Sequence, residues 1–269
     1  MIYLRTCFSA PNEIKFLKLN LRESFNHIDK FIVCEFNRTH TGAERELIFN
    51  KYLDVFTPEE RQKIIYIGAD VSKQTKYSKT DHQIIKSNEK LMWGYFAREI
   101  DLKNSDIVFA VDADEIIYEH FYKPIIRKIN FFCPRVLLNF YTFFYKINYL
   151  WVSEDCRAPI ACKAGFYKNE YPASWRYEGR LFSQRAGCHF SWCLTIDEMI
   201  HKLKVYGHAD IYGHFAEREI LEDAVRNKKY PFEPDKLFDI RVLDLQNDQN
   251  YYPKSIYSML DEFDYLIAK

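Results

Sequence analysis

Three acidic residues follow an apolar run in the stretch VFAVDADEI, and their types and spacing suit them to holding a divalent cation. In an extended backbone, Asp112 and Asp114 point to the same side, where two carboxylates repel each other unless a cation or a proton lies between them. Hard oxygen ligands favour Mg²⁺ or Mn²⁺, and phosphate oxygens fill the remaining coordination positions of such an ion. The stretch therefore predicts a site for a metal ion and a diphosphate, with Asp112 and Asp114 as metal ligands.

Two simpler interpretations of the same acids stay open on the residues alone. Asp114 and Glu115 could stabilise the N-terminus of a following helix, or the three acids could form a solvated turn. No rival catalytic motif competes with the acidic stretch, because the sequence contains no GxxxxGK[ST], GxGxxG, HExxH or GxSxG pattern.

The elements around the acidic stretch alternate between strand and helix. Apolar runs predict strands at 2–8, 30–36, 63–67 and 106–111. Helical patterns lie at 11–27, 44–56, 58–62 and 81–102. Such alternation predicts a largely parallel sheet with helices on both faces, and in these sheets ligands bind at the carboxyl ends of the strands.

The second half of the chain has a different pattern. Residues 133–191 read as several strands with irregular connections, and helices are expected at 195–206, 217–228 and 255–267. Thr195 and Glu198 have the spacing of a capping box at the start of the first of these helices. We therefore expect one α/β domain with a mixed, mostly parallel central sheet.

Composition narrows the class of protein. The 38 basic and 38 acidic residues cancel, which removes the overall electrostatic reason to expect a nucleic acid partner. No window reaches the roughly 18 apolar residues of a transmembrane segment, and the N-terminus lacks the pattern of a secretory signal. Seven cysteines without a CxxC pair favour a reducing compartment and predict a cytoplasmic protein. The aromatic share of 17% indicates an aromatic core or a groove that stacks sugars or bases.

Four segments together resemble glycosyltransferase family seventeen, the group of the bisecting N-acetylglucosaminyltransferase that acts on the β-mannose of N-glycans. They are FIVCEFNRTHTGAEREL (31–47), WGYFAREID (93–101), IVFAVDADEI (107–116) and AGCHFSWCLTIDEMIHKLKVYGH (186–208). The sequence departs from the family pattern at Ile117, where the family has proline, and at Cys188, where it has tryptophan. It also shows no membrane anchor or stem, so the acceptor need not be an N-glycan.

The resemblance implies a GT-A fold, a nucleotide-sugar donor such as a UDP-sugar, a divalent ion (Mn²⁺ or Mg²⁺) and inversion at the anomeric carbon. It also implies that 1–117 form the nucleotide-binding half of the domain and 118–269 the acceptor-binding half. Asp114 is then the first choice as a direct metal ligand, while Asp112 contacts ribose or holds a metal-bound water and Glu115 supports the loop. The candidate donor-binding residues are Glu35, Asn37, Arg38, Thr39, Arg98, Asp112, His189 and His208. For residues 35–39 a local hydrogen-bonded turn remains the alternative.

The implied reaction moves a sugar, with N-acetylglucosamine as a candidate, to a hydroxyl of a glycan acceptor. An inverting transferase needs a general base to deprotonate that hydroxyl, and the candidates are Glu154, Asp155 and Glu178. Two other classes of function stay open: a metal-dependent nucleotidyltransferase or nucleotide-sugar hydrolase on a similar sheet, and a non-catalytic module that binds glycans through Trp151, Trp175 and Trp192.

Overall fold

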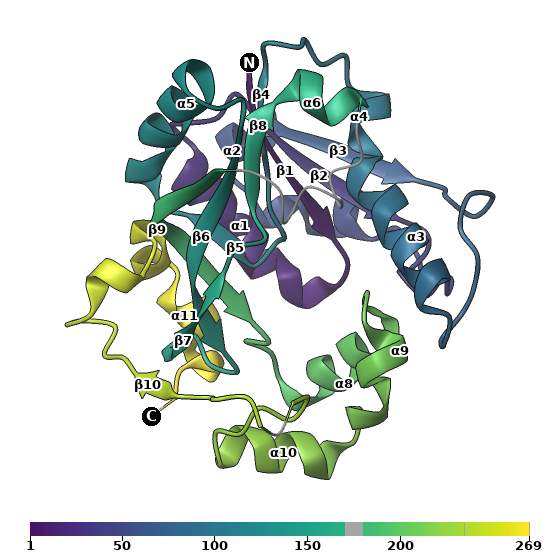
Figure 1. Ribbon diagram of the computed structural model, residues 1–269, viewed down its shortest axis with the longest axis vertical. Helices are drawn as coiled ribbons and strands as arrows, with labels where there is room; N and C mark the ends of the chain where they lie inside the picture. Colours follow the sequence, from purple (N-terminus) through teal and green to yellow (C-terminus); the bar gives the residue numbers. More distant parts are fainter. Residues whose placement is uncertain (170–179, 234, 269) are drawn as a thin grey trace.

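A mixed ten-stranded sheet runs through the computed structural model, which describes residues 1–169, 180–233 and 235–268 (Figure 1). Its strands are β1 (Ile2–Phe8), β2 (Lys30–Phe36), β3 (Ile64–Ala69), β4 (Ile107–Ala110), β5 (Glu115–Ile117), β6 (Arg135–Phe144), β7 (Tyr149–Cys156), β8 (Ile160–Lys163), β9 (Arg180–Ser191) and β10 (Ile240–Val242). The main path has the order β10-β7-β6-β8-β4-β1-β2-β3, and β9 pairs with both β5 and β6.

The α-helices and 3₁₀ turns are mostly short. The α-helices are α1 (Ile14–Ser24), α2 (Pro58–Lys63), α3 (His82–Gly94), α4 (Phe96–Glu99), α5 (Tyr122–Phe131), α6 (Ala164–Asn169), α8 (Ile196–Val205), α9 (Ala209–Tyr212), α10 (Arg218–Arg226) and α11 (Leu260–Phe263). The 3₁₀ turns are η1 (Pro11–Glu13), η2 (Phe49–Val55), η3 (Glu119–Phe121), η4 (Gly213–Phe215), η5 (Gln249–Tyr251), η6 (Lys254–Ser258) and η7 (Asp264–Leu266). Thr195 and Glu198 form the predicted capping box of α8.

Strands β4, β1, β2 and β3 form the parallel part of the sheet, as the alternating pattern predicts. Helices α1 and α5 bury Leu17, Leu21 and Ile125 against one face of it. Helices α3 and α4 bury Met92 and Phe96 against the other face. Because both faces are covered, these strands are apolar almost throughout, and their carboxyl ends open toward the same edge. The predicted α/β class, with a sheet flanked by helices, is confirmed.

The second half of the chain adds antiparallel strands to this sheet. Strand β6 pairs antiparallel with β7 and β8 and parallel with β9, while the short β5 pairs antiparallel with β9. The C-terminal turns pack on β6 and β9 through Ile256, Met259 and Phe263. Helices α8 and α10 cover Trp151 and Trp192 in a separate aromatic cluster (Figure 1). Both of these tryptophans are core residues rather than sugar-stacking platforms; Trp175 lies outside the described residues.

Several predicted helices are wrong in part. The segment 44–48 is not helical, because Arg45 donates side-chain hydrogen bonds to Phe8 O and Phe36 O, and Glu35 accepts from the Ile48 N–H. These bonds tie the segment to the strand ends in place of a helix. The predicted helix 81–102 is divided into α3 and α4, and the predicted helix 255–267 is divided into η6, α11 and η7. Among the described residues, no helix is long and apolar enough to cross a bilayer.

Gly187 is required where β5 meets β9. A Cβ atom at this position would lie 2.1 Å from the Ile116 carbonyl oxygen and 2.8 Å from the Phe140 ring. We therefore expect Gly187→Ala to push β5 away from β9 and to lower the free energy of unfolding by about 1–3 kcal/mol, the usual cost of overpacking. Chemical denaturation measures this change.

Gly165→Ala is the matched control for that variant. A Cβ at Gly165 would meet the Asn104 side chain at 3.3 Å, which can shift, and alanine is the better helix former in α6. Its stability should stay close to that of the natural protein. A Gly187→Ala protein as stable as the Gly165→Ala protein would contradict the tight β5–β9 contact.

Candidate active site

The acidic stretch forms a turn at the carboxyl end of β4 rather than an extended strand. The Glu115 N–H donates to the Asp112 carbonyl at 3.1 Å, and the Asp112 N–H donates to Glu115 Oε2 at 2.6 Å. The prediction that Asp112 and Asp114 lie on one side of an extended backbone is therefore wrong. Glu115 is buried, with only 1% of its surface exposed. Its carboxylate stabilises the turn, because it accepts the hydrogen bond of the Asp112 N–H, which would otherwise lack a partner.

Asp114 faces two cationic side chains from the second half of the chain. Its Oδ1 lies 3.6 Å from His189 Nε2, and its Oδ2 lies 3.9 Å from Lys202 Nζ. Strand pairing sets this geometry, because Glu115 stands opposite His189 in the β5–β9 ladder and the Phe190 N–H donates to the Asp114 carbonyl. His189 comes from β9 and Lys202 from α8, so three elements meet at one carboxylate.

The charges at this position shift the pKa of both partners. Burial alone would raise the pKa of Asp114, but His189 and Lys202 lower it to about 2, so this carboxylate is ionised at neutral pH. Burial alone would lower the pKa of His189, but the neighbouring Cys156 and Asp114 raise it well above the usual value. Asp114 is thus held as an anion in a partly buried position, with 17% of its side chain exposed.

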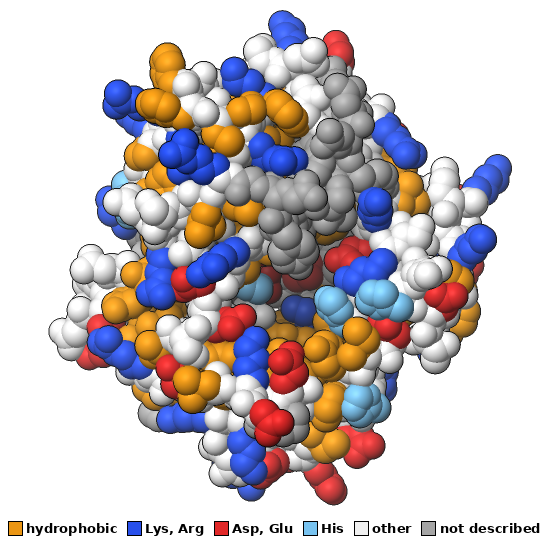
Figure 2. Space-filling view, viewed as in Figure 1, with side chains coloured by type: hydrophobic (Ala, Val, Ile, Leu, Met, Phe, Trp, Pro, Cys, Tyr) orange, Lys and Arg blue, Asp and Glu red, His pale blue; other side chains and the backbone are white. Residues whose placement is uncertain are grey.

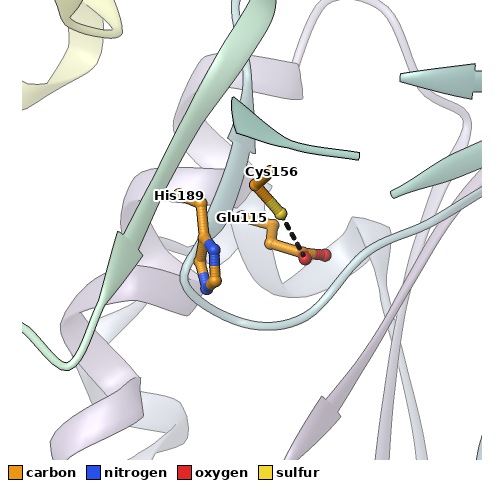
Figure 3. A group of neighbouring side chains, drawn as sticks. All are labelled: Glu115, Cys156 and His189. Atoms are coloured by element: carbon orange, nitrogen blue, oxygen red, sulfur yellow. Dashed lines mark hydrogen bonds between the residues drawn. The ribbon is translucent and has the colours of Figure 1, made fainter. Parts of the chain in front are cut away.

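A second set of potential metal ligands adjoins the first. Glu115, Cys156 and His189 each offer one ligand atom, and these atoms lie within 4.8 Å of one another (Figure 3). The Cys156 thiol donates to Glu115 Oε1 at 3.6 Å, and burial raises the pKa of this thiol. His189 therefore stands between a carboxylate on one side and a carboxylate–thiol pair on the other, so an oxygen-rich or a sulfur-containing ligand set could include it.

Glu13 is a site residue that the sequence reasoning missed. It ends η1, directly after the carboxyl end of β1, and its Oε2 accepts the Ser9 N–H at 2.6 Å. The pKa of Glu13 is raised to about 7, mainly by burial and in addition by the negative charge of Asp114. The hydrogen bond from the Ser9 N–H and the positive charge of Lys202 limit this rise. The rule that ligands bind at the carboxyl ends of parallel strands applies to Glu13 as well as to Asp112, and is the signal that could have found it.

The EFNRT segment is built into the loops beyond β2. Glu35 is fully buried and accepts hydrogen bonds from the Ile48 and Phe49 N–H groups and from the Tyr66 hydroxyl. Asn37 joins this loop to the one after β3, since its side chain donates to Asp70 and accepts from the Val71 N–H.

Arg38 and Thr39 also bond to residues of the loop that follows β2. Arg38 pairs with Glu44 at 2.8 Å, and the Thr39 hydroxyl accepts from the Ala43 N–H at 3.1 Å. These contacts fit the local-turn alternative, and the donor-binding role of Glu35, Asn37, Arg38 and Thr39 stays a prediction. The loops lie at the carboxyl end of β2.

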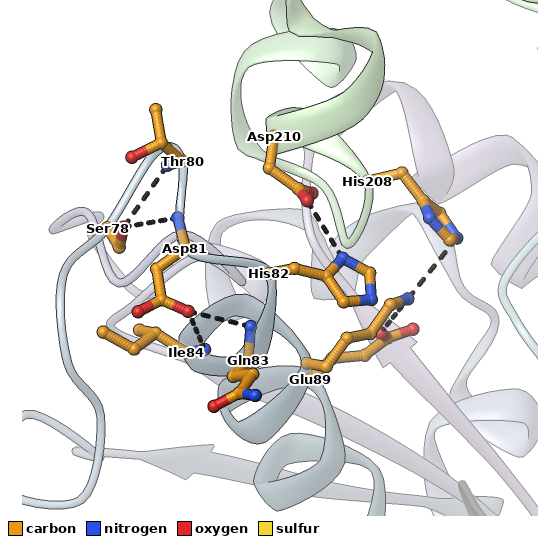
Figure 4. A network of polar contacts seen from close by, with 10 residues as sticks. Ser78, Thr80, Asp81, His82, Gln83, Ile84, Glu89, His208 and Asp210 are labelled. Carbon is orange, nitrogen blue, oxygen red and sulfur yellow. Dashed lines mark hydrogen bonds and ion pairs between the residues drawn. The ribbon is translucent and has the colours of Figure 1, made fainter.

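His208 lies in a different polar network, between α3 and α9 (Figure 4). Its Nε2 is 3.4 Å from Lys86 Nζ, and Lys86 also pairs with Glu89 at 2.7 Å. In the same network His82 Nδ1 contacts Asp210 Oδ2 at 2.9 Å. Burial and the neighbouring Lys86 lower the pKa of His208, which favours the neutral imidazole. Within the described residues no recorded contact joins His208 to Asp112, Asp114 or His189.

The remaining predicted residues are dispersed. Arg98 is exposed on α4, and among the described residues no recorded contact joins it to the acidic turn. Glu154 pairs with Lys236 at 3.3 Å. Asp155 accepts from Arg185 at 2.8 Å and from Asn139 at 3.2 Å. Glu178 lies outside the described residues. The structure therefore brings Asp114 and His189 together, with Asp112 in the same turn as Asp114, and places Glu154, Asp155 and His208 in contacts of their own.

The arrangement defines a sheet-based enzyme with charged groups gathered at the carboxyl ends of its parallel strands, and sequence comparison identifies the family. The model of glycosyltransferase family 17 matches residues 5–239. The chain belongs to glycosyltransferase family 17. It is therefore a glycosyltransferase. No curated protein matches the sequence.

Several solved structures show a distant similarity to this chain. The 4-diphosphocytidyl-2C-methyl-D-erythritol synthase from Anaerococcus prevotii is 13% identical, with a TM-score of 0.40 over 69% of this chain and 79% of that one. HddC from Yersinia pseudotuberculosis is 8% identical, with a TM-score of 0.39 over 71% of this chain and 91% of that one. The galactosyltransferase LgtC, solved with donor and acceptor sugar analogues, is 9% identical, with a TM-score of 0.38 over 65% and 62%.

The bonds of Glu35 predict that this residue supports the fold. Glu35→Ala leaves two backbone N–H groups and the Tyr66 hydroxyl without their acceptor and opens a cavity. We expect a loss of about 3 kcal/mol or more in the free energy of unfolding, measured by urea titration. Glu44→Ala removes an acid that is 83% exposed, and should change stability by less than about 0.5 kcal/mol. If Glu35→Ala impaired sugar transfer while leaving stability unchanged, a direct donor contact would replace this structural role.

Proposed function

We propose that the protein is a metal-dependent, inverting transferase that moves a sugar from a UDP-sugar, with N-acetylglucosamine as the candidate, to a hydroxyl of a glycan acceptor. The observation that carries the proposal is the meeting of Asp114, His189 and Lys202 at the carboxyl end of β4, in a chain that belongs to family 17. A nucleoside diphosphate is the leaving group of such a reaction, and this end of the sheet is where its phosphates would lie.

The residues of the site suit a divalent cation. Asp114 is ionised and partly buried, Asp112 lies in the same turn, and His189 would offer an imidazole nitrogen after a bound cation displaces its proton. These three residues would hold Mn²⁺ or Mg²⁺, with carboxylate oxygens as the hard ligands that both ions prefer. When bound, such an ion offsets the negative charge that develops on the departing diphosphate.

Lys202 would contribute a fixed positive charge to the same phosphates. It comes from the last turn of α8, and its ammonium group lies above the Trp192 ring at 5.1 Å from the ring centroid. The aromatic face holds the side chain toward Asp114 while the ammonium stays available to an anion. His189 and Lys202 both belong to the half that was expected to bind the acceptor, so donor binding would join the two halves.

The general base must take a proton from the acceptor hydroxyl, and Glu13 is our first candidate. A carboxyl group with a pKa near the working pH is the most effective proton acceptor, and Glu13 has a pKa of about 7. Glu154 and Asp155 are tied to Lys236 and Arg185, although a bound acceptor could rearrange those pairs. Glu154, Asp155 and Glu178 remain candidates on the acceptor side.

The free thiols of the protein support a proposal for the cellular compartment in which it works. All seven cysteines are free, and four of them, Cys34, Cys162, Cys188 and Cys193, are buried. Burial raises the pKa of Cys34 and of Cys188, which makes these thiols unreactive and compatible with a reducing environment. We propose that the protein works in the cytoplasm.

The Asp114 carboxylate provides the main test of the proposal. Asp114→Asn keeps the shape of the side chain and removes its charge, so sugar transfer from UDP-sugars in the presence of Mn²⁺ should fall at least about 100-fold. Mass spectrometry of the acceptor measures the transfer. Asp54→Asn, at a position that is 98% exposed, is the matched control and should keep full activity.

The same assay separates the alternative classes of enzyme. Sugar release without an acceptor would identify a nucleotide-sugar hydrolase, and exchange of the nucleotidyl group would identify a nucleotidyltransferase. A thermal-shift screen of nucleoside diphosphates with Mn²⁺ adds an independent readout, because a ligand that binds only the folded protein raises its apparent melting temperature. Full transfer by Asp114→Asn would contradict the assigned role of the acidic turn.

Glu13 gives a prediction for the dependence of the reaction on pH. A general base must be unprotonated, so kcat/KM of the natural enzyme should fall as the pH drops below about 7, the pKa of Glu13. Glu13→Gln should lower kcat by about 10²- to 10⁴-fold and remove that limb of the pH profile. Glu46→Gln, on an exposed side chain, is the control. An unchanged pH profile in Glu13→Gln would assign the base to another carboxylate.

A further inference from the structure

Two exposed aromatic residues form an apolar tip at the C-terminal end of α5. Phe131 and Phe132 end the helix and are 75% and 70% exposed, the two highest values among the large hydrophobic residues of the described chain. Single exposed apolar side chains are common on protein surfaces, but two adjacent aromatic rings at this exposure form a patch. Over α5, Figure 2 shows hydrophobic and basic side chains next to one another.

Basic residues surround this tip. A shallow groove of about 600 Å³ lies between α5 and the start of β9, and its lining includes the cations Lys123, Arg127, Lys128 and Arg180. Lys128 is held in place, since it donates to the Leu181 carbonyl at 3.1 Å and lies 5.2 Å from the centroid of the Phe182 ring. Within the described residues, the other three cations form no ion pair and the groove has no acidic lining residue.

The helical period places these groups on one face. Lys123, Arg127 and Phe131 are spaced four residues apart, so they form a stripe along the outer surface of α5. The opposite face buries Tyr122, Ile125 and Ile129 in the core. The helix is therefore fixed to the sheet by one face and presents cations followed by aromatic rings on the other, in a chain whose net charge is zero.

We propose that this surface, formed by α5 and the start of β9, docks on the anionic surface of a membrane. Lipid phosphates would bind the four cations, and Phe131 and Phe132 would enter the boundary between headgroups and acyl chains. Interfacial helices combine these two features, because apolar burial and attraction to anionic lipids add together. A nucleic acid fits the surface less well, since a protein without net positive charge gains little long-range attraction to a polyanion.

The proposal is independent of the sugar-transfer reaction. It needs no metal ion, donor or acceptor, so vesicle binding and catalysis can succeed or fail separately. Membrane docking would bring the enzyme to acceptors that are carried on lipids, and no helix of the described chain provides a span for that purpose.

Co-sedimentation of the full chain with lipid vesicles tests the proposal. We expect binding to vesicles of phosphatidylcholine mixed with phosphatidylglycerol, weak or no binding to phosphatidylcholine alone, and loss of binding as salt is added. Equal binding to both kinds of vesicle, or no binding to either, would overturn it. Binding of single-stranded RNA through the same residues in place of vesicles would also overturn it.

Two variants separate the two parts of the surface. Lys123→Glu with Arg127→Glu should weaken vesicle binding on the order of tenfold or more, because each basic residue near an anionic membrane contributes about a fivefold factor. Phe131→Ser with Phe132→Ser should weaken it by a similar factor while leaving its dependence on salt unchanged. Circular dichroism and thermal melting should show natural folding, because all four side chains lie outside the core.

A matched control places the same changes elsewhere. Lys73→Glu, Lys79→Glu and Tyr77→Ser remove two exposed cations and one aromatic ring that is 60% exposed, in the loop before α3. This variant should bind vesicles as the natural protein does. If it loses binding as strongly as the α5 variants, the attraction depends on total charge and the assignment to α5 is wrong.

Discussion

The short antiparallel pairing between β5 and β9 is the contact on which the site depends. It places Glu115 opposite His189 and hydrogen-bonds Phe190 to the Asp114 carbonyl, so the acidic turn of the first half meets the histidine of the second. The pairing is possible only because Gly187 leaves room for the Ile116 carbonyl. A three-residue strand thus couples the parallel sheet to the added antiparallel strands, and the electrostatics of Asp114 follow from that coupling.

The buried carboxylates of this fold mainly stabilise loops and turns by accepting hydrogen bonds from backbone N–H groups. Glu35 holds the loop after β2, Glu115 closes the acidic turn, and Glu23 accepts the Glu119 and Ser255 N–H groups and so ties α1 to the C-terminal segment. Each has backbone donors in place of water, which is how a buried acid avoids a large desolvation cost. Asp114 and Glu13 are less buried than these acids, and this difference in burial separates the structural carboxylates from the two that we propose act in the site.

The sequence predicts local structure where burial alone determines it. Strands β1 and β2 agree with the expected ranges because their apolar runs are covered on both faces, and α8 begins at its predicted capping box. The segment 44–48 could not be predicted, since its conformation is set by Glu35 and Arg45 hydrogen bonds to distant strand ends. The family resemblance indicated both Asp114 and His189 as site residues. Their contact depends on the pairing of β5 with β9, which no local sequence pattern predicts.

His189 and His208 are both predicted site residues, but their surroundings shift their pKa values in opposite directions. His189 is raised in pKa between Asp114 and Cys156, whereas His208 is kept neutral by burial and Lys86. The network of His208, Lys86, His82 and Asp210 joins α9 to α3, so it links the helices beyond β9 to the first half of the chain. Lys202 on α8 reaches Asp114 and gives a second contact with that half. A ligand held by both Asp114 and Lys202 would therefore further join α8 to the acidic turn, in addition to the hydrogen bonds between α9 and α3.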